Sequence, residues 1–263
     1  MKHHTGLLVA ALVAAAPPLS AQTSSRGDHR PEAASFYGSA VAVGDREVLI
    51  AEPVSSRSPG VVYVYRRDRA GRWAETQRLT ASDATIMDRF GRAIAVDGGI
   101  LLAGATSRDS ARGGAYIFTR DAAGRWSEAQ RLVASDAVAG DALGRAVALR
   151  GDLALVASWG NNKSAGAVYV FRRDGGGRWV QEAKLTAADA AEDDFFGTGL
   201  AIEGDRVLIG ASERQERAGA AYVFRYDRAA RAWQPEGRLA PSGLEANAGF
   251  GAAAALRQGT AYV

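Results

Sequence analysis

The chain has 263 residues, a formal net charge of +3 and no cysteine, so disulfide and thiolate chemistry are excluded. Basic and acidic residues are interspersed and form no runs, which indicates a solvated surface of mixed charge and no nucleic-acid partner. Of the three histidines only His29 lies beyond the first four residues, so a multi-histidine zinc site is excluded, and a Ser-His-Asp arrangement would have to use His29.

Residues 1–21 have the features of a secretory signal peptide. A weakly basic start at Lys2 is followed by an apolar run over residues 6–16, and residues 19–21 end in a small side chain. The run is shorter than the roughly 20 residues that cross a bilayer. Residues 22–35 are polar with almost no apolar periodicity, which is typical of a flexible leader. We therefore expect an exported protein, periplasmic, cell-surface or extracellular, with no membrane span.

One plan recurs about every 53 residues through the rest of the chain. Each copy opens with an aromatic or leucine residue followed by glycine, and these glycines are spaced by 53, 53, 53 and 54 residues. The opening pairs are Tyr37-Gly38, Phe90-Gly91, Leu143-Gly144, Phe196-Gly197 and Phe250-Gly251. The copies therefore cover residues 36–89, 90–142, 143–195, 196–249 and, in part, 250–263.

The first half of each copy predicts a tight β-hairpin. Alanine alternates with larger aliphatic residues over residues such as 93–96, which is the two-residue period of a strand. A turn of glycine and aspartate follows, where residues tolerate the positive φ of a two-residue hairpin. The second strand ends at a position that holds only small residues, which indicates little space. The small residues at that position are Ala51, Gly104, Ala157 and Gly210.

The second half of each copy carries aromatic residues in register. The third strand has aromatic residues on one face and β-branched residues on the other. Its copies are centred on Val64, Ile117, Val170 and Val223. The last strand starts at a tryptophan, at position 73, 126, 179 or 233, and buries a leucine. Four short strands per copy predict an all-β fold, a β-propeller built from four-stranded antiparallel blades.

Residues 36–263 resemble the FG-GAP family, whose repeats form integrin α-subunit propellers and occur in many exported bacterial proteins. The resemblance rests on the opening pairs and on Gly104-Ala105-Thr106 and Gly210-Ala211-Ser212. Because propellers of this family usually have seven blades, it implies that four complete repeats and the start of a fifth are a fragment of a larger propeller. Calcium-binding members carry an Asp-x-Asp-x-Asp-Gly loop between the first two strands, and here that loop is a bare hairpin, so we expect no calcium and no other cofactor.

Two sets of aspartates recur between copies. They are Asp83, Asp136 and Asp189, and Asp88, Asp141 and Asp194. Their repetition predicts turn hydrogen bonds to backbone N–H groups. The alternative is that such carboxylates, at the propeller mouth, serve a carbohydrate-active hydrolase or lyase, since propellers host such enzymes.

In the FG-GAP family, ligands meet the face built by the loops between the second and third strands and between blades. The residues that map to this face here are Arg57, Arg108, Asp109, Trp159, Asn161, Asn162, Arg214 and Glu216. Trp159 departs from the repeat, so it is either a platform for a sugar or a protein partner or, as we favour, a filler between blades.

These features predict a non-enzymatic exported propeller that binds a protein or glycan, or mediates adhesion, through that face. The hydrolase is the first alternative, and a scaffold that only assembles is the second. An unclosed propeller exposes an apolar face on each terminal blade, worth about 12 kcal/mol if it measures ~500 Å². We therefore expect residues 22–263 alone to self-associate on size exclusion.

Overall fold

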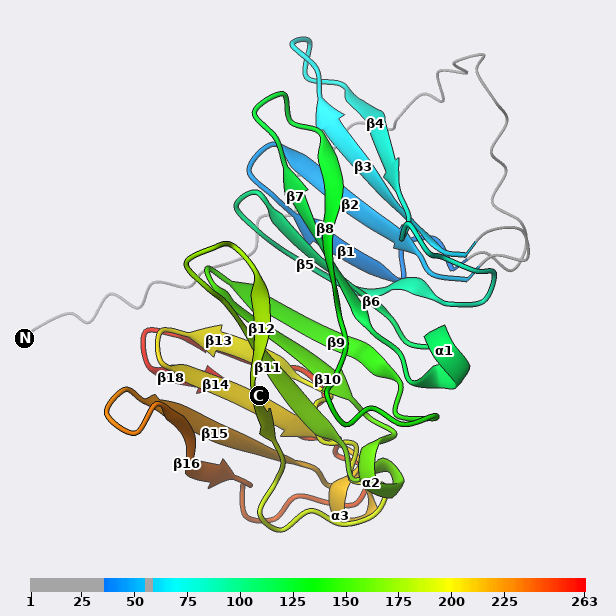
Figure 1. The fold of residues 1–263 in the computed structure, drawn as a ribbon. Coiled ribbons are helices and arrows are strands. Elements are labelled where there is room, and N and C mark those ends of the chain that lie inside the picture. The colour runs from blue at the N-terminus through cyan, green and yellow to red at the C-terminus, as the bar shows by residue number, and fades with distance from the viewer. Residues whose placement is uncertain (1–35, 55–58) are drawn as a thin grey trace, which may run out of the picture. The chain divides into compact units, whose positions relative to one another are not determined.

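The computed structural model of the protein describes residues 36–54 and 59–263 (Figure 1). The expected signal peptide and leader, residues 1–35, lie outside the described residues, as does Arg57. The described chain forms four separate four-stranded antiparallel sheets and one two-stranded sheet. In each four-stranded sheet the strands are neighbours in chain order, which is the arrangement of a propeller blade.

The four sheets, which we call blades 1 to 4, coincide with the four complete copies of the sequence plan. Blade 1 contains β1 (Ala40–Val43), β2 (Glu47–Glu52), β3 (Val61–Arg67) and β4 (Trp73–Leu79). Blade 2 contains β5 (Phe90–Asp97), β6 (Ile100–Ala105), β7 (Ala115–Arg120) and β8 (Trp126–Leu132). Blade 3 contains β9 (Leu143–Arg150), β10 (Leu153–Ser158), β11 (Ala167–Arg173) and β12 (Trp179–Leu185). Blade 4 contains β13 (Leu200–Glu203), β14 (Arg206–Ala211), β15 (Ala220–Asp227) and β16 (Ala232–Leu239). The predicted β-propeller blades are therefore confirmed.

The partial fifth copy forms a hairpin of β17 (Ala255–Arg257) and β18 (Thr260–Tyr262). Its Leu256 packs against blade 4. At the other end, blade 1 presents Val41 and Val43 with 55% and 75% of their surface exposed. Self-association of the chain stays a prediction. Val41 and Val43 are exposed apolar side chains through which two copies could associate.

The third strand of each blade divides its side chains between two neighbours. Tyr116 and Phe118 of β7 share a buried cluster with residues of blade 1, whereas Ile117 shares one with blade 3. The same division recurs in β11, where Tyr169 faces blade 2 and Val170 faces blade 4. The predicted alternation is confirmed, and its cause is that adjacent strand residues point to opposite faces of the sheet.

The opening glycine of each blade fits against the narrow position of the blade before it. Gly144 has a φ of +97°, which favours glycine, and its carbonyl oxygen lies 2.0 Å from where a Cβ of Gly104 would be. The same contact joins Gly251 to Gly210, at 1.8 Å. The sequence predicted little space at the end of the second strand. The space is small because the backbone of the next blade lies directly against this position.

The loop between the second and third strands is a left-handed turn in blades 2, 3 and 4. These turns contain α1 (Arg108–Ala111), α2 (Asn161–Ser164) and α3 (Arg214–Arg217). In blade 2, three consecutive residues ending at Ala111 have φ between 51° and 60°. The turn directs the carbonyl groups of Ala111 and Arg112 to the next blade, where they accept hydrogen bonds from the N–H groups of Ala142 (2.7 Å) and Leu143 (3.0 Å). The sequence predicted only a loop here.

Glutamine side chains join the outer strands of successive blades. The amide of Gln130 in β8 donates to the carbonyl oxygen of Trp179 (2.7 Å) and accepts from its N–H (2.8 Å). Gln77 makes the same pair of bonds to Trp126. Trp126 and Trp179 are buried against the preceding blade, whereas Trp73 is 51% exposed.

Replacing Gln130 with Ala is expected to lower the free energy of unfolding by about 1–2 kcal/mol, because two hydrogen bonds between blades are lost. The cost is limited because Gln130 is only half-buried, and blade 3 has Ala183 at the equivalent place. Urea denaturation followed by tryptophan fluorescence measures the change. Gln234→Ala is the control, because Gln234 is exposed on the outer strand of blade 4. Equal effects of the two substitutions would contradict the bridging role.

Candidate functional site

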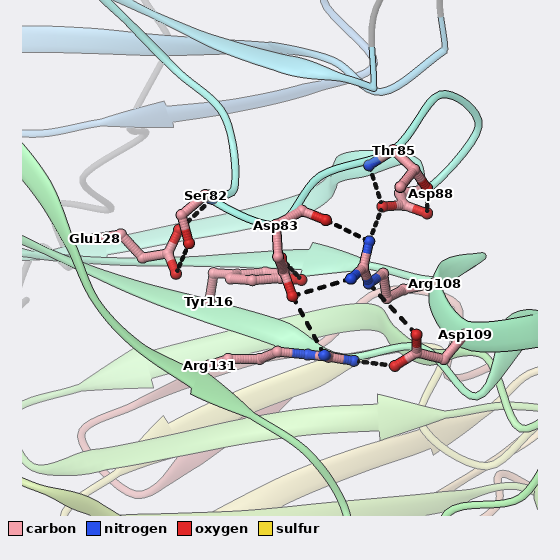
Figure 2. A network of polar contacts seen from close by, with 9 residues as sticks. All are labelled: Ser82, Asp83, Thr85, Asp88, Arg108, Asp109, Tyr116, Glu128 and Arg131. Atoms are coloured by element: carbon pink, nitrogen blue, oxygen red, sulfur yellow. Dashed lines mark hydrogen bonds and ion pairs between the residues drawn. The ribbon is translucent and has the colours of Figure 1, made fainter.

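The turns between second and third strands and the loops that link the blades lie on one face, which we call the loop face. Arg108, at the start of the turn in blade 2, reaches the loop that links blades 1 and 2 (Figure 2). Its guanidinium lies 2.9 Å from Asp88 Oδ2 and 3.1 Å from Asp83 Oδ2. Arg108 was predicted to contact a ligand, and the structure places it as an anchor between a turn and a link.

Arg214 and Asn161 occupy the same position in the other blades. Arg214 is buried and pairs with Asp189 at 3.0 Å and with Asp194. Asn161 is also buried, and its amide donates to Asp141 Oδ2 at 3.4 Å. These two residues, both predicted as ligand-binding, therefore hold the loop face together from within.

The buried aspartate of each link fastens its own loop. Asp88 accepts hydrogen bonds from the N–H and hydroxyl of Thr85, both at 2.7 Å. Burial alone would raise the pKa of Asp88, but these bonds and the Arg108 guanidinium hold it below its ordinary value. Asp141 and Asp194 likewise accept from backbone N–H groups of their links, at 2.9 and 2.8 Å. The predicted turn hydrogen bonds are confirmed for this set.

The other recurring aspartates have a different partner from the predicted one. The hydroxyl of Tyr116 in β7 donates to Asp83 at 2.8 Å, 33 residues away in the chain. Tyr169 and Tyr222 donate in the same way to Asp136 and Asp189 at 2.7 and 2.8 Å. Burial, and then the bond to Asp189, raises the pKa of Tyr222 to about 12. The hydroxyl group of each buried tyrosine ring thus has a hydrogen-bond acceptor in the link that precedes its blade.

Arg131 of β8 extends the network toward the exposed part of the turn. Its guanidinium lies 3.3 Å from Asp83 and also pairs with Asp109 (Figure 2). The hydrogen bond from Arg131 lowers the pKa of Asp109 against a smaller effect of burial. Asp109, predicted to bind ligand, is therefore exposed but held in a fixed orientation. Asn162 and Glu216, the two other predicted residues in these turns, are exposed.

Trp159 is half-buried at the end of β10. Its indole N–H donates to the carbonyl oxygen of Gly197 (3.0 Å), and its ring meets the edge of Phe195 at 5.8 Å. The guanidinium of Arg145 lies 4.5 Å from the ring centroid. These contacts favour the interpretation of Trp159 as a filler between blades. They also place a cation beside it that sequence reasoning missed, because Arg145 has an arginine, Arg92, at the equivalent position of blade 2 and so does not stand out from the repeat.

The described ranges hold no group of three or more His, Asp or Glu residues placed to bind a metal ion. No helix among these residues is long and apolar enough to cross a membrane.

Comparisons with known proteins agree with this architecture. The sequence profile described as "FG-GAP repeat" matches residues 73–118, 126–171 and 179–224, which together make up more than half of the chain. Each match runs from the last strand of one blade to the third strand of the next, so each covers one junction. No curated protein matches the sequence.

Among solved structures, the fold is similar to that of a protein from Lactobacillus plantarum, with a TM-score of 0.56 and 14% sequence identity. The alignment covers 78% of this chain and 57% of that one, so the chain spans little more than half the length of this neighbour. At this identity the likeness concerns the fold alone. The repeat matches and the junction geometry lead to one assignment: the chain belongs to the FG-GAP repeat family.

Proposed function

We propose that the protein is an exported, non-enzymatic binding protein that holds a protein or glycan on its loop face. The observation that carries this proposal is the contrast between anchored and exposed positions in one turn. The first residue of the turn, such as Arg108 or Arg214, forms an ion pair with a buried aspartate. The exposed second residue differs between blades and is Asp109, Asn162 or Gln215. A rigid frame with varied exposed loops is the usual design of a binding surface.

Exposed apolar side chains in the links support the same proposal. Ile86, Met87 and Val138 are 58%, 56% and 57% exposed, and they lie within three residues of the anchored Asp88 and Asp141. Protein interfaces are enriched in methionine and depleted of charge at their centre. On the loop face these side chains offer apolar contact beside ordered polar groups.

One of the two sets of recurring carboxylates that a hydrolase could use is buried and fastens the loops. Asp88, Asp141 and Asp194 are at most 5% exposed and fasten loop backbones. A catalytic acid or base must instead reach the substrate within hydrogen-bond distance. This supports binding over hydrolysis.

The experiment probes purified protein against a glycan array and a peptide library, with variants Ile86→Ser, Met87→Ser and Val138→Ser combined. Retention of ligand is expected to fall at least about tenfold, as for loss of a few central interface contacts. The control is Val180→Ser, because Val180 is exposed on the outer strand β12, away from the links. Turnover of a polysaccharide that Asp141→Asn abolishes, with folding intact, would contradict the proposal.

A further inference from the structure

Three arginines gather where blades 2 and 3 meet the loop face. Arg92 and Arg145 directly follow the opening glycines of β5 and β9, and Arg89 precedes Phe90. All three are half-buried. The strands β5 and β9, which carry Arg92 and Arg145, pack against each other. Burial first, and then the charges of Arg92 and Arg89, lower the pKa of Arg145.

A cavity of about 340 Å³ opens beside two of these cations, Arg89 and Arg145. Its lining includes Arg89, Arg145 and Trp159, together with Thr106, Ser107 and Phe195. Trp159 fixes the Arg145 guanidinium by a cation–π contact. The cavity thus combines positive charge, hydroxyl donors and a rigid wall.

The residues of this cavity depart from the repeat. The place of Arg92 and Arg145 is taken by Ser39 in blade 1 and by Thr198 in blade 4. The place of Trp159 is taken by Thr106 in blade 2 and Ser212 in blade 4. Because the other blades fold without these arginines and this tryptophan, the blade fold itself does not require them.

The charges of these arginines are not neutralised within the described ranges. No carboxylate there forms an ion pair with Arg89, Arg92 or Arg145, whereas Arg108 and Arg214 on the same face pair with three and two aspartates. Grouping like charges in a half-buried place costs stability. A bound anion would remove that cost.

We propose that this cavity binds a tetrahedral oxyanion with about two negative charges, a phosphate or sulfate group, which Arg89 and Arg145 on the wall hold and which the positive charge of Arg92 attracts. Guanidinium groups match such anions because they offer two parallel N–H donors. The hydroxyl groups of Thr106 and Ser107 are further donors on the wall. The proposal does not depend on a macromolecular ligand of the loop face, since the group is either a free anion or carried on a saccharide.

The test measures thermal unfolding of the full chain in sodium chloride, sulfate and phosphate at equal ionic strength. Three proteins are compared: wild type, the triple variant Arg89→Gln, Arg92→Gln and Arg145→Gln, and a control of equal charge, Arg46→Gln, Arg69→Gln and Arg178→Gln, all exposed. Wild type and control are expected to gain about 5 °C or more in Tm at 100 times the dissociation constant. The triple variant should gain only the general stabilisation by excluded anions.

Two further measurements complete the test: one on the single variant Arg92→Gln and one with a sulfated oligosaccharide. Arg92→Gln is expected to raise Tm in chloride, because one repelling charge is gone, and to reduce the response to sulfate. A sulfated oligosaccharide added at the same sulfate concentration separates a carried group from a free one: a larger shift than with inorganic sulfate identifies the carried form, and an equal or smaller shift the free anion. Equal responses of all three proteins, or a lower Tm of Arg92→Gln in chloride, would overturn the proposal, because the arginines would then have a structural role.

Discussion

Gly104→Ala is expected to lower the free energy of unfolding by about 3–5 kcal/mol, because the added methyl group has no space between two backbones. The added Cβ would lie 2.0 Å from the carbonyl oxygen of Gly144, inside any allowed contact. Neither backbone can retreat freely, because Gly104 pairs with Ala115 in β7 and Gly144 opens the next blade. Blades 2 and 3 would have to move apart at this contact.

Gly175→Ala is the matched control for this substitution. Gly175 lies in the hairpin between β11 and β12, has no positive φ and has no atom within 4 Å of its added Cβ. Equilibrium denaturation of both variants, followed by circular dichroism and tryptophan fluorescence, should show a large loss for Gly104→Ala and almost none for Gly175→Ala. A loss below about 1 kcal/mol for Gly104→Ala, the cost of an ordinary substitution, would show that the blades do not meet as described.

Arg108→Met is expected to lower the free energy of unfolding by about 3 kcal/mol. Methionine keeps most of the apolar volume, but the buried carboxylate of Asp88 loses its cation, and an unpaired buried charge is strongly destabilising. Asp83 loses a partner as well, although Arg131 remains beside it. Chemical denaturation measures the loss. Arg112→Met is the control, since Arg112 is exposed and follows the same turn.

The pH dependence separates charge from packing in this variant. The pKa of Asp88 is depressed in the folded protein, so its contribution is present above the ordinary value of 3.8 and is lost as pH falls through the folded value. Without Arg108 the pKa of Asp88 rises, and acid unfolding should begin at a higher pH than in wild type. An unchanged acid midpoint together with a 3 kcal/mol loss would assign the effect of Arg108 to packing instead.

The strands could be predicted from the sequence because their determinants are local and repeated. Trp126 and Trp179 start the last strands of their blades as predicted, and the aromatic residues around Ile117 face one neighbour. Alternation and turn glycines act within a few residues, so four copies of the same pattern reinforce one another. The narrow position at Gly104 was also visible, because the copies hold nothing larger than alanine there.

The loop face could not be predicted in the same way, because tertiary contacts decide it. The residues of the left-handed turn that ends at Ala111 include no glycine that would indicate positive φ in the sequence. The carbonyl groups at the end of this turn accept hydrogen bonds from N–H groups about thirty residues later in the chain. The bond from Tyr116 to Asp83 also spans separate blades, so Asp83 looked like an ordinary turn residue. Arg108 looked like a variable surface residue, since its equivalent in blade 3 is Asn161 and only geometry reveals their shared partner.

The junction contacts also explain how such a chain can lengthen during evolution. The tyrosine–aspartate bond and the glycine contact each join one blade to its immediate neighbour, at separations fixed by the repeat. Duplicating a whole copy therefore creates a junction of the existing kind, without a new interface having to arise. The one irregularity in length, the extra residue before Trp233, lies in the hairpin of β15 and β16, at the opposite end of β15 from the turn that holds the next blade. Growth by whole units, with length variation confined to that outer hairpin, leaves every contact between neighbours intact.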